Sequence, residues 1–438
     1  MKVGDPYQVK ILKMVSKGKG IAQLEDKVVF IPYVLPEETV DIKIQEIKKD
    51  YLLAEKISVD KSSPFRVDSP CSFFEKCGGC QWQMIDYPHQ LQFKSDLFKE
   101  TLKRIGKLHL DISDLIPASD PFHYRRKVQF RTSFENGKIL IGFYRLESKR
   151  LISIDHCLIV PPILNNLLRE VSLYLNQNAL SFKTLKETTF SLSSPSDDVL
   201  IELKGTELPD KVSIAQGLFR LSVRIRGITL SAENRPSKCL GKSYFFNTVI
   251  NPLHPEETLK IRNSTGAFSQ VNWEMNLKLI ETLLAWAQLS GQEQLLELYC
   301  GSGNFTLLMA KQAQHIVAVE ENPAAVEDLR FNLKENQIDN CSIRKGSAQQ
   351  VLSRWDKKRF PVDLLVSDPP REGMDHLTLQ SILRILPARI IYISCDPATL
   401  ARDLRVLSNR YSIQRIALFD MFPQTAHIES LTELQLSI

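Results

Sequence analysis

The sequence predicts a multidomain α/β protein: a small, OB-like β-barrel, a central α+β domain with a four-cysteine cluster, and a C-terminal Rossmann-like, doubly wound domain. Three observations lead to this fold class. The chain has 438 residues, more than the roughly 250–300 that one hydrophobic core usually serves. Short alternating strand patterns crowd its beginning, and strand and helix patterns alternate regularly from Asn272 onward. We place the domains at residues 1–60, 61–265 and 266–438.

The composition is that of an ordinary globular protein, with 43% hydrophobic and 24% charged residues. No apolar run approaches the ~20 residues that a membrane-spanning helix needs. The start, MKVGDPYQVKILK, alternates like a strand and has no apolar core of a signal peptide. We therefore expect a cytoplasmic protein with no membrane partner, and we expect a monomer.

Residues 1–60 predict the β-barrel. The strand patterns YQVKILKMV, IAQL, KVVFIPYV, TVDIKIQEIKK and YLLAEKISV follow one another closely, with turn residues such as Gly18 and Gly20 between them. The prolines Pro64 and Pro70 mark the end of this unit.

Residues 61–265 begin with a cysteine cluster and an amphipathic helix over about 87–105, and then favour strands. Residues 123–150 are strongly basic, with Glu135 and Glu147 as the acidic side chains. The basic residues are Arg125, Arg126, Lys127, Arg131, Lys138, Arg145, Lys149 and Arg150. Such a segment attracts the phosphates of RNA, although the solvated face of a strand is an alternative.

The chain has eight cysteines, and structural disulfides are rare in the reducing cytosol. Clustered cysteines in such a chain favour metal binding or catalysis.

Residues 266–438 alternate strands and helices. The strands LLELYC, HIVAVE, CSIRKG, VDLLVSD and RIIYISC are separated by helical patterns, and the strand-like YSIQRIALFDMF and SLTELQLSI close the chain. This regularity is typical of a mostly parallel, doubly wound sheet.

A nucleotide site is predicted where the strand LLELYC ends. Gly301 and Gly303 allow a tight turn before a helix, and Glu320 ends the next strand, where its carboxylate can accept the hydroxyls of a ribose. Thr306 stands where a dinucleotide fingerprint has its third glycine. The pattern therefore favours S-adenosylmethionine over NAD, because this cofactor has no pyrophosphate to bind.

Two further strand ends face the same crevice of a doubly wound sheet. Asp368 precedes two prolines, which restrict its backbone, and could accept a ring N–H of a base. Cys395 precedes a helix that starts at Pro397, whose N-terminus favours a thiolate, and is a candidate nucleophile. Near the C-terminus, Glu429 is a candidate proton acceptor, with His427 as the alternative.

Five segments together resemble the class I S-adenosylmethionine-dependent RNA uracil-5-methyltransferase family. They are 267–272 (AFSQVN), 297–306 (ELYCGSGNFT), 368–371 (DPPR), 393–395 (ISC) and 422–429 (FPQTAHIE), in the family's order and spacing. The resemblance implies that Cys395 attacks the target base and that Glu429 is the general base. The residues implied to contact the methyl donor are Gln270, Tyr299, Asn304, Glu320 and, for donor or target base, Asp368. The glycine turn described above adds Gly301 as a candidate donor contact.

The chemistry explains why such an enzyme needs a thiolate. Carbon 5 of uracil is not nucleophilic, but addition of sulfur to carbon 6 gives an enolate that is. Carbon 5 then takes the methyl group, and a base removes the carbon-5 proton so that the sulfur can leave.

The N-terminal half extends the resemblance. Residues 1–60 are similar to a TRAM domain, a small RNA-binding barrel. Cys71, Cys77, Cys80 and Cys157 resemble the iron–sulfur ligands of the ribosomal-RNA branch of the family. Four thiolates suit a 4Fe-4S cluster or a tetrahedral zinc, and the residues alone do not choose between them. The resemblance favours the 4Fe-4S cluster.

Three positions depart from the family's pattern. Glu297 replaces a commoner Asp, Ser347 lies where a carboxylate or amide often contacts the adenine, and Glu372 stands where a small residue is usual. Ser347 stays a candidate donor contact, but the departure puts the adenine contact in doubt.

The expected partner is RNA. Large-subunit (23S) ribosomal RNA is favoured over transfer RNA, because relatives specialised for transfer RNA usually lack the barrel, the cluster or both. From other classes, a non-catalytic RNA-binding or assembly factor and a radical enzyme are alternatives. An intact Cys395 and Glu429 argue against the first, and a fourth cysteine argues against the second.

Overall fold

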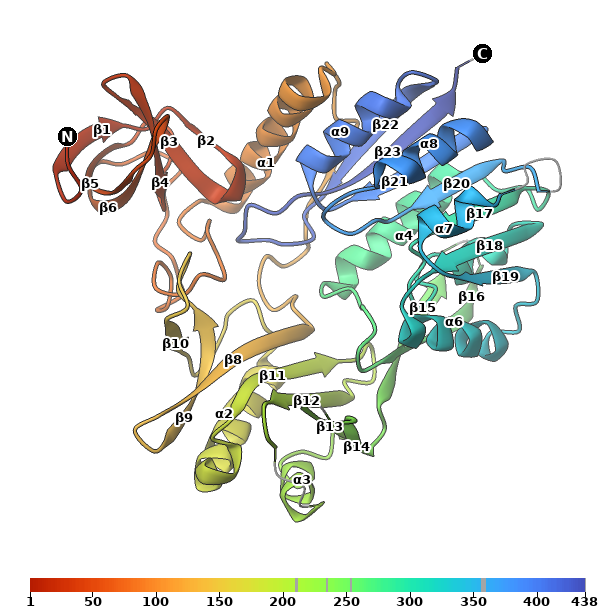
Figure 1. Cartoon of the computed structure of the whole chain (residues 1–438), viewed down its shortest axis with the longest axis horizontal. Helices are drawn as coiled ribbons and strands as arrows, with labels where there is room; N and C mark the ends of the chain where they lie inside the picture. The colour runs from red at the N-terminus through yellow and green to blue at the C-terminus, as the bar shows by residue number, and fades with distance from the viewer. Residues whose placement is uncertain (209–211, 234, 253, 356–359, 438) are drawn as a thin grey trace.

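The structure, a computed structural model, describes residues 1–208, 212–233, 235–252, 254–355 and 360–437. Figure 1 shows three parts, an N-terminal barrel, a central domain and a C-terminal α/β domain, arranged around the middle of the molecule. The predicted fold class, a multidomain α/β protein with a small barrel and a doubly wound C-terminal sheet, is confirmed.

The barrel is a six-stranded sheet in the order β1-β5-β6-β4-β3-β2. Its strands are β1 (Pro6–Lys10), β2 (Lys13–Met14), β3 (Lys19–Leu24), β4 (Lys27–Pro32), β5 (Thr39–Ile47) and β6 (Tyr51–Lys61), with a 3₁₀ turn η1 (Ser16–Gly18). Alternate side chains such as Val29, Ile31, Val40 and Ile42 are fully buried and form its core.

A connecting segment carries the cysteine loop and then α1 (Tyr87–Thr101), which continues as a π-helical turn, η2 (Leu102–Gly106). Asp86 begins α1 because its side chain accepts a hydrogen bond from the His89 amide. Both α1 and η2 contact α9 of the C-terminal domain, described below. The helix therefore belongs in space with the C-terminal domain.

The central domain is a seven-stranded sheet in the order β10-β9-β8-β11-β12-β13-β14. Its strands are β8 (Lys127–Glu135), β9 (Lys138–Tyr144), β10 (Leu151–Ser153), β11 (Leu185–Leu192), β12 (Val199–Gly205), β13 (Ile225–Ala232) and β14 (Lys238–Gly241). The helices α2 (Pro162–Gln177) and α3 (Val212–Phe219) pack against it, and η3 (Ala179–Phe182) follows α2. A hairpin of β15 (Tyr244–Asn251) and β16 (His254–Ser264) leads to the C-terminal domain, where it contacts α6.

The C-terminal sheet has eight strands in the order β19-β18-β17-β20-β21-β23-β22-β7. They are β17 (Gln294–Leu298), β18 (His315–Glu320), β19 (Cys341–Lys345), β20 (Leu364–Ser367), β21 (Arg389–Ser394), β22 (Tyr411–Phe419), β23 (Glu429–Leu436) and β7 (Asp114–Ile116). The five strands β17 to β21 are parallel, and β23 runs antiparallel between β21 and β22. The edge strand β7 comes from residues before the C-terminal domain and pairs with β22.

Helices cover both faces of this sheet. They are α4 (Trp273–Ala287), α5 (Thr306–Ala310), α6 (Pro323–Glu335), α7 (Ala348–Ser353), α8 (His376–Ile385) and α9 (Pro397–Leu407). Neighbouring residues of one strand, such as Leu295 and Leu296, belong to different apolar clusters, one with α4 to α6 and the other with α1 and α7 to α9. Burial on both faces is why the strands read as continuous apolar runs. No helix of the described residues is long and apolar enough to cross a membrane.

Candidate active site

A pocket lies at the carboxyl end of β17, where a doubly wound sheet binds its ligand. Its lining includes five residues predicted to contact the methyl donor, Gln270, Tyr299, Gly301, Asn304 and Asp368. Phe268, 68% exposed, adds an aromatic ring to the same pocket. The structure thus brings together residues that are up to 98 positions apart in the sequence, which is Gln270 to Asp368.

The loop after β17 is shaped by left-handed backbone. Gly303 has a φ of +95°, and a Cβ there would lie 2.7 Å from Leu329 Cδ1, so only glycine fits. The Gly301 amide donates to Glu320 Oε2 (2.9 Å), and the Asn322 amide donates to Glu320 Oε1 (2.7 Å). Glu320 is therefore held beside the glycine loop, and its oxygens keep lone pairs for a ribose.

Buried polar pairs support this loop from below. Asn304 exchanges two hydrogen bonds with Asn276 of α4, at 2.8 and 2.9 Å. Thr306 Oγ1 donates to Glu297 Oε2 (2.6 Å), and burial raises the pKa of Glu297 to about 8. Glu297, which departs from the family's pattern, and Thr306, which departs from the dinucleotide fingerprint, thus bond to each other.

Ser347 has another role in the structure. Its hydroxyl accepts a hydrogen bond from the Gln350 amide (3.3 Å), and the Gln350 side chain accepts from the Ser347 amide. This capping box begins α7. Neither Ser347 nor Glu320 is among the residues that line the pocket described above.

Cys395 and Glu429 lie beside each other because of strand register. Ser394 of β21 pairs with Ser430 of antiparallel β23, so the next position of each strand places Cys395 opposite Glu429. Residues opposite each other in an antiparallel pair have Cβ atoms about 4.5–5.5 Å apart. Glu429 is 6% exposed, and Cys395 is partly buried.

The surroundings of Cys395 do not favour a thiolate. Burial, and then the negative charges of Glu429 and Asp368, raise the pKa of Cys395 to about 12, while Arg371 lowers it. The expectation that the helix N-terminus favours a thiolate is wrong here. The first free amides of α9, on Ala398 and Thr399, already donate to the Asp396 carboxylate.

The carboxyl groups of Asp368 and Glu429 influence each other. Desolvation raises the pKa of Asp368 to about 7, and burial together with the charge of Asp368 raises the pKa of Glu429 well above its ordinary value. Two acids in one desolvated site do not ionise together readily, so the pair retains a proton near neutral pH. His427, two residues before Glu429, is an exposed residue, although desolvation and the charges of Arg371, Lys94 and Arg125 lower the pKa of its imidazole.

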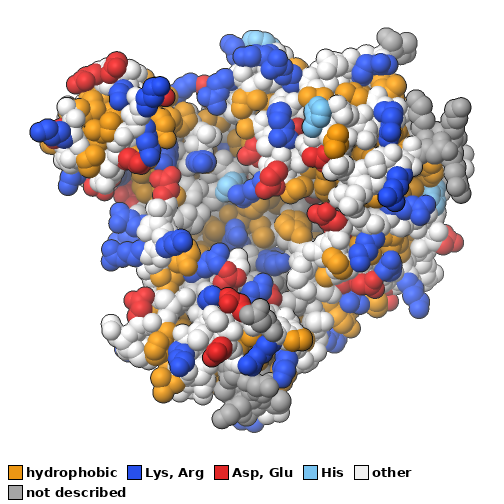
Figure 2. All heavy atoms as spheres, viewed as in Figure 1, with side chains coloured by type: hydrophobic (Ala, Val, Ile, Leu, Met, Phe, Trp, Pro, Cys, Tyr) orange, Lys and Arg blue, Asp and Glu red, His pale blue; other side chains and the backbone are white. Residues whose placement is uncertain are grey.

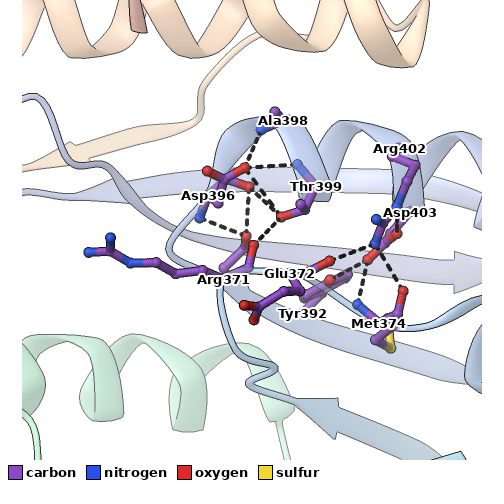
Figure 3. A network of polar contacts seen from close by, with 10 residues as sticks. Arg371, Glu372, Met374, Tyr392, Asp396, Ala398, Thr399, Arg402 and Asp403 are labelled. Atoms are coloured by element: carbon purple, nitrogen blue, oxygen red, sulfur yellow. Dashed lines mark hydrogen bonds and ion pairs between the residues drawn. The ribbon is translucent and has the colours of Figure 1, made fainter. Parts of the chain in front are cut away.

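A polar network ties the loop after Asp368 to the helix after Cys395 (Figure 3). Thr399 Oγ1 donates to the Arg371 carbonyl (3.1 Å), and Arg402 donates to the carbonyls of Glu372 and Met374 (2.9 Å each). The Arg371 side chain extends away from this network, so the backbone is fixed while the guanidinium stays available.

The four predicted metal-binding cysteines come from the cysteine loop and the segment before α2. Cys77, Cys80 and Cys157 each have a raised pKa, first from burial and also from the charge of other members of the set. The Gly79 amide lies 3.3 Å from Cys77 Sγ. Within the described ranges, however, no group of three or more His, Cys, Asp or Glu side chains is arranged to hold a metal ion.

One buried atom fits a group bound at these cysteines. Tyr33 is buried, with 8% of the residue exposed, yet its hydroxyl has no hydrogen-bond partner among the described residues. It lies close enough to Cys77 and Cys80 for their charges to raise the pKa of the phenol. The soft thiol donors and this unpaired hydroxyl are compatible with an iron–sulfur cluster or zinc.

Seven of the eight basic residues fall into two groups, and the partly buried Arg125 belongs to neither. Arg126 and Arg131 form ion pairs with Asp197 and Glu187, and Lys127 donates to the Ala267 carbonyl. The four exposed members are Lys138, Arg145, Lys149 and Arg150. Figure 2 shows lysine and arginine side chains around a hollow between the three parts of the molecule, which suits a phosphate backbone.

Sequence reasoning missed several residues that support the site. Asn276 has a side chain aimed at the pocket loop, and Gln90 and Lys94 of α1 contact the segment before Glu429. A sequence pattern could have indicated Gln90 and Lys94, which lie four residues apart on the buried face of α1. Buried polar side chains need hydrogen-bond partners, so such a pair predicts a contact with another part of the chain.

Comparisons with known proteins identify the family of the chain. The family described as tRNA (uracil-5-)-methyltransferase matches residues 86–436, and the TRAM domain matches residues 1–57. A protein described as an uncharacterized RNA methyltransferase of Halalkalibacterium halodurans is 32% identical, covering 99% of this chain and 97% of its own. One of the same description from Listeria innocua is 32% identical, covering 100% and 99%.

Among solved structures, the tRNA (uracil-54, C5)-methyltransferase of Pyrococcus abyssi, in complex with S-adenosyl-L-homocysteine, has a TM-score of 0.76 at 22% identity. The match covers 97% of this chain and 99% of that one, so it extends over the barrel as well as the C-terminal domain. With its TRAM domain and the matches above, the chain belongs to the tRNA (uracil-5-)-methyltransferase family and is an S-adenosylmethionine-dependent RNA methyltransferase.

Proposed function

We propose that the enzyme transfers a methyl group from S-adenosylmethionine to carbon 5 of a uridine in large-subunit (23S) ribosomal RNA, through a covalent bond between Cys395 and carbon 6. The observation that carries the proposal is the placement of Cys395 opposite Glu429, next to the pocket that Asp368 and Tyr299 share. A nucleophile and a base on neighbouring strands can serve the same ring.

The donor, when bound, supplies an electrophilic methyl group. The pocket residues Gln270 and Asn304 would contact the donor, and Glu320, beside the glycine loop, would accept the hydroxyls of its ribose. The remaining chemistry belongs to the chain. Cys395 gives up its thiol proton to water and adds to carbon 6 as the thiolate, and carbon 5 then takes the methyl group. Glu429 takes the carbon-5 proton, and the thiolate leaves as the ring double bond re-forms.

The resting thiol is protonated, because its pKa lies far above neutral pH. Arg371 is the nearby cation that lowers this pKa, and its guanidinium is not engaged in the network of Figure 3. We therefore assign to Arg371 the task of stabilising the Cys395 thiolate when the target uracil enters the crevice.

Cys71, Cys77, Cys80 and Cys157 would hold a 4Fe-4S cluster, or less readily a zinc ion. What supports this is the donor chemistry of four thiols that influence one another, and the unpaired hydroxyl of Tyr33 beside them. The cluster's contribution in this proposal is to order the loop that leads into α1.

Transfer RNA is the second candidate substrate, and one observation favours it. The Pyrococcus abyssi enzyme, named for a uridine of transfer RNA, matches nearly the whole length of this chain. The barrel therefore does not by itself separate the two substrates. The exposed Lys138, Arg145, Lys149 and Arg150 suit either RNA.

We further propose that the enzyme is a cytoplasmic monomer.

The test is an assay with labelled donor and purified 23S ribosomal RNA or transfer RNA, offered separately and in competition, followed by mapping of 5-methyluridine. We expect incorporation into ribosomal RNA that depends on Cys395. Preferential labelling of transfer RNA would replace the substrate proposal, and incorporation that survives Cys395→Ala would overturn the covalent mechanism.

A further inference from the structure

The segment between β22 and β23, residues 420–428, is held mainly by parts of the chain outside the C-terminal domain. We propose that Gln90 and Lys94, on the buried face of α1, are positioning residues for the proton-removal step, which hold this segment over Glu429 and Cys395. The inference rests on the proposed covalent mechanism, and it deepens that mechanism by assigning one step to α1.

Lys94 holds the start of the segment. Its ammonium group lies 2.5 Å from Asp420 Oδ1 and donates to the Phe422 carbonyl at 3.0 Å. The side chains of Lys94 and Asp420 are 2% and 0% exposed. A buried ion pair of this kind fixes geometry, because neither partner can move away without leaving a charge unpaired.

Gln90, one helical turn earlier, holds the middle of the segment. Its amide nitrogen donates to Gln424 Oε1 (3.0 Å) and to the Ile85 carbonyl (2.9 Å), and its oxygen accepts from the Gln424 amide (3.0 Å). Gln424 is 4% exposed and has a φ of +67°, a conformation that a glutamine rarely adopts unless its surroundings impose it.

Four consecutive carbonyls of the segment accept hydrogen bonds from elsewhere. Met421 accepts from Asn272, Phe422 from Lys94, Pro423 from the Tyr124 hydroxyl and Gln424 from the amides of Gln81 and Trp82. The central domain, α1 and the residues directly after Cys80 therefore all converge on one stretch of backbone.

The consequence concerns Glu429, which begins β23 directly after this segment. The sheet fixes the backbone of Glu429, and the residue is 6% exposed. On this proposal, the segment before it limits the water that reaches the carboxyl group. If the segment loosens, the base loses its place against carbon 5. Addition of Cys395 and methyl transfer precede that step and do not use the base.

The test uses full-length enzyme with Gln90→Met, which keeps the side-chain volume and removes the polar contacts, and Gln92→Met as the matched control. Gln92 is exposed on the same helix and bonds to Asp96. In single turnovers with RNA, we expect Gln90→Met to form the methylated RNA–protein adduct at close to the wild-type rate and to release it about ten- to a hundredfold more slowly. Gln92→Met should behave as wild type.

Two further measurements separate positioning from loss of fold. Donor binding by Gln90→Met should stay near wild type, and its thermal unfolding should stay cooperative with a lowered midpoint, because Gln424 and the Ile85 carbonyl lose their buried partner. The pH profile of adduct release should move to lower pH as Glu429 becomes hydrated. In a double-mutant cycle, Gln90→Met with Gln424→Met should release no more slowly than Gln424→Met alone. If Gln90→Met does not fold, Gln90→Glu, which keeps the acceptor for the Gln424 amide, replaces it.

The outcomes distinguish the two proposals. If wild-type enzyme forms no adduct with RNA that carries 5-fluorouridine, the covalent mechanism fails. If wild type forms the adduct and Gln90→Met releases product as fast as Gln92→Met, the positioning role is overturned. It is also overturned if Gln90→Met slows adduct formation and release equally, since that is the result of a general structural defect.

Discussion

Cys395 and Glu429 face each other one position beyond the last paired residues of β21 and β23. The two strands run in opposite directions, so a nucleophile at the end of one and a base at the start of the other reach the same point of the crevice. Their roles come at different steps of the reaction, and substitutions should therefore have different signatures.

Replacing the nucleophile should stop the reaction before it begins. We expect Cys395→Ser to lower methyl incorporation by at least about a thousandfold, because a hydroxyl is a far weaker nucleophile at neutral pH. The measurement is the transfer of a labelled methyl group from the donor to RNA that is then retained on a filter. Cys239→Ser, at an exposed cysteine that is not part of the pocket lining, is the control and should keep full activity.

Replacing the base should trap the enzyme on its product. We expect Glu429→Gln to complete methyl transfer to carbon 5 but to release RNA about 10²- to 10⁴-fold more slowly, since general base catalysis contributes about that much. Denaturing gels of enzyme mixed with labelled RNA would show the accumulated adduct. If Glu429→Gln turns over normally and accumulates no adduct, the general base is another residue, and His427 is the next candidate.

The raised pKa of Cys395 predicts a slow, pH-dependent reaction with alkylating agents. A thiol with a pKa of about 12 is ionised in about one molecule in ten thousand at pH 8, and the thiolate is the reactive form. Alkylation of Cys395 should therefore be much slower than that of the exposed Cys239 and should rise about tenfold per pH unit up to pH 10. Peptide mass spectrometry of both sites in one sample measures the ratio. Equal rates at pH 7 would contradict the environment described for Cys395.

The buried pair of Lys94 and Asp420 should matter to stability as well as to positioning. We expect Lys94→Met to lower the free energy of unfolding by about 3–5 kcal/mol, because it leaves the Asp420 carboxylate buried without a counter-charge. The double variant Lys94→Met, Asp420→Leu should recover most of this loss. Urea unfolding measures both, with Lys99→Met on the exposed side of α1 as a control within about 0.5 kcal/mol of wild type.

The cysteine set predicts a defined response to metal. Anaerobic reconstitution with iron and sulfide should give a visible chromophore with about four irons per chain. Cys80→Ser should abolish it and Cys239→Ser should leave it unchanged. Binding of one zinc by the same four cysteines, with no chromophore, would replace the cluster by a tetrahedral site.

Local sequence patterns determined much of this protein. Strand and helix periodicity predicted the barrel and the doubly wound sheet, because burial on one or two faces leaves a repeating signature. The glycine loop, Asp368 and Cys395 were predicted to meet because parallel strands bring their carboxyl ends to one edge. Each of these inferences needs only a short stretch of chain and the rule for its strand.

Tertiary structure decided the rest. Antiparallel insertion of β23 sets Cys395 opposite Glu429, and no local pattern fixes that register. Burial beside two carboxyl groups raises the pKa of Cys395, although its place before a helix predicted the reverse. Gln90 and Gln424 are 334 positions apart, and such contacts depend on how separate domains pack, which the free energy of the whole fold determines and local propensity does not.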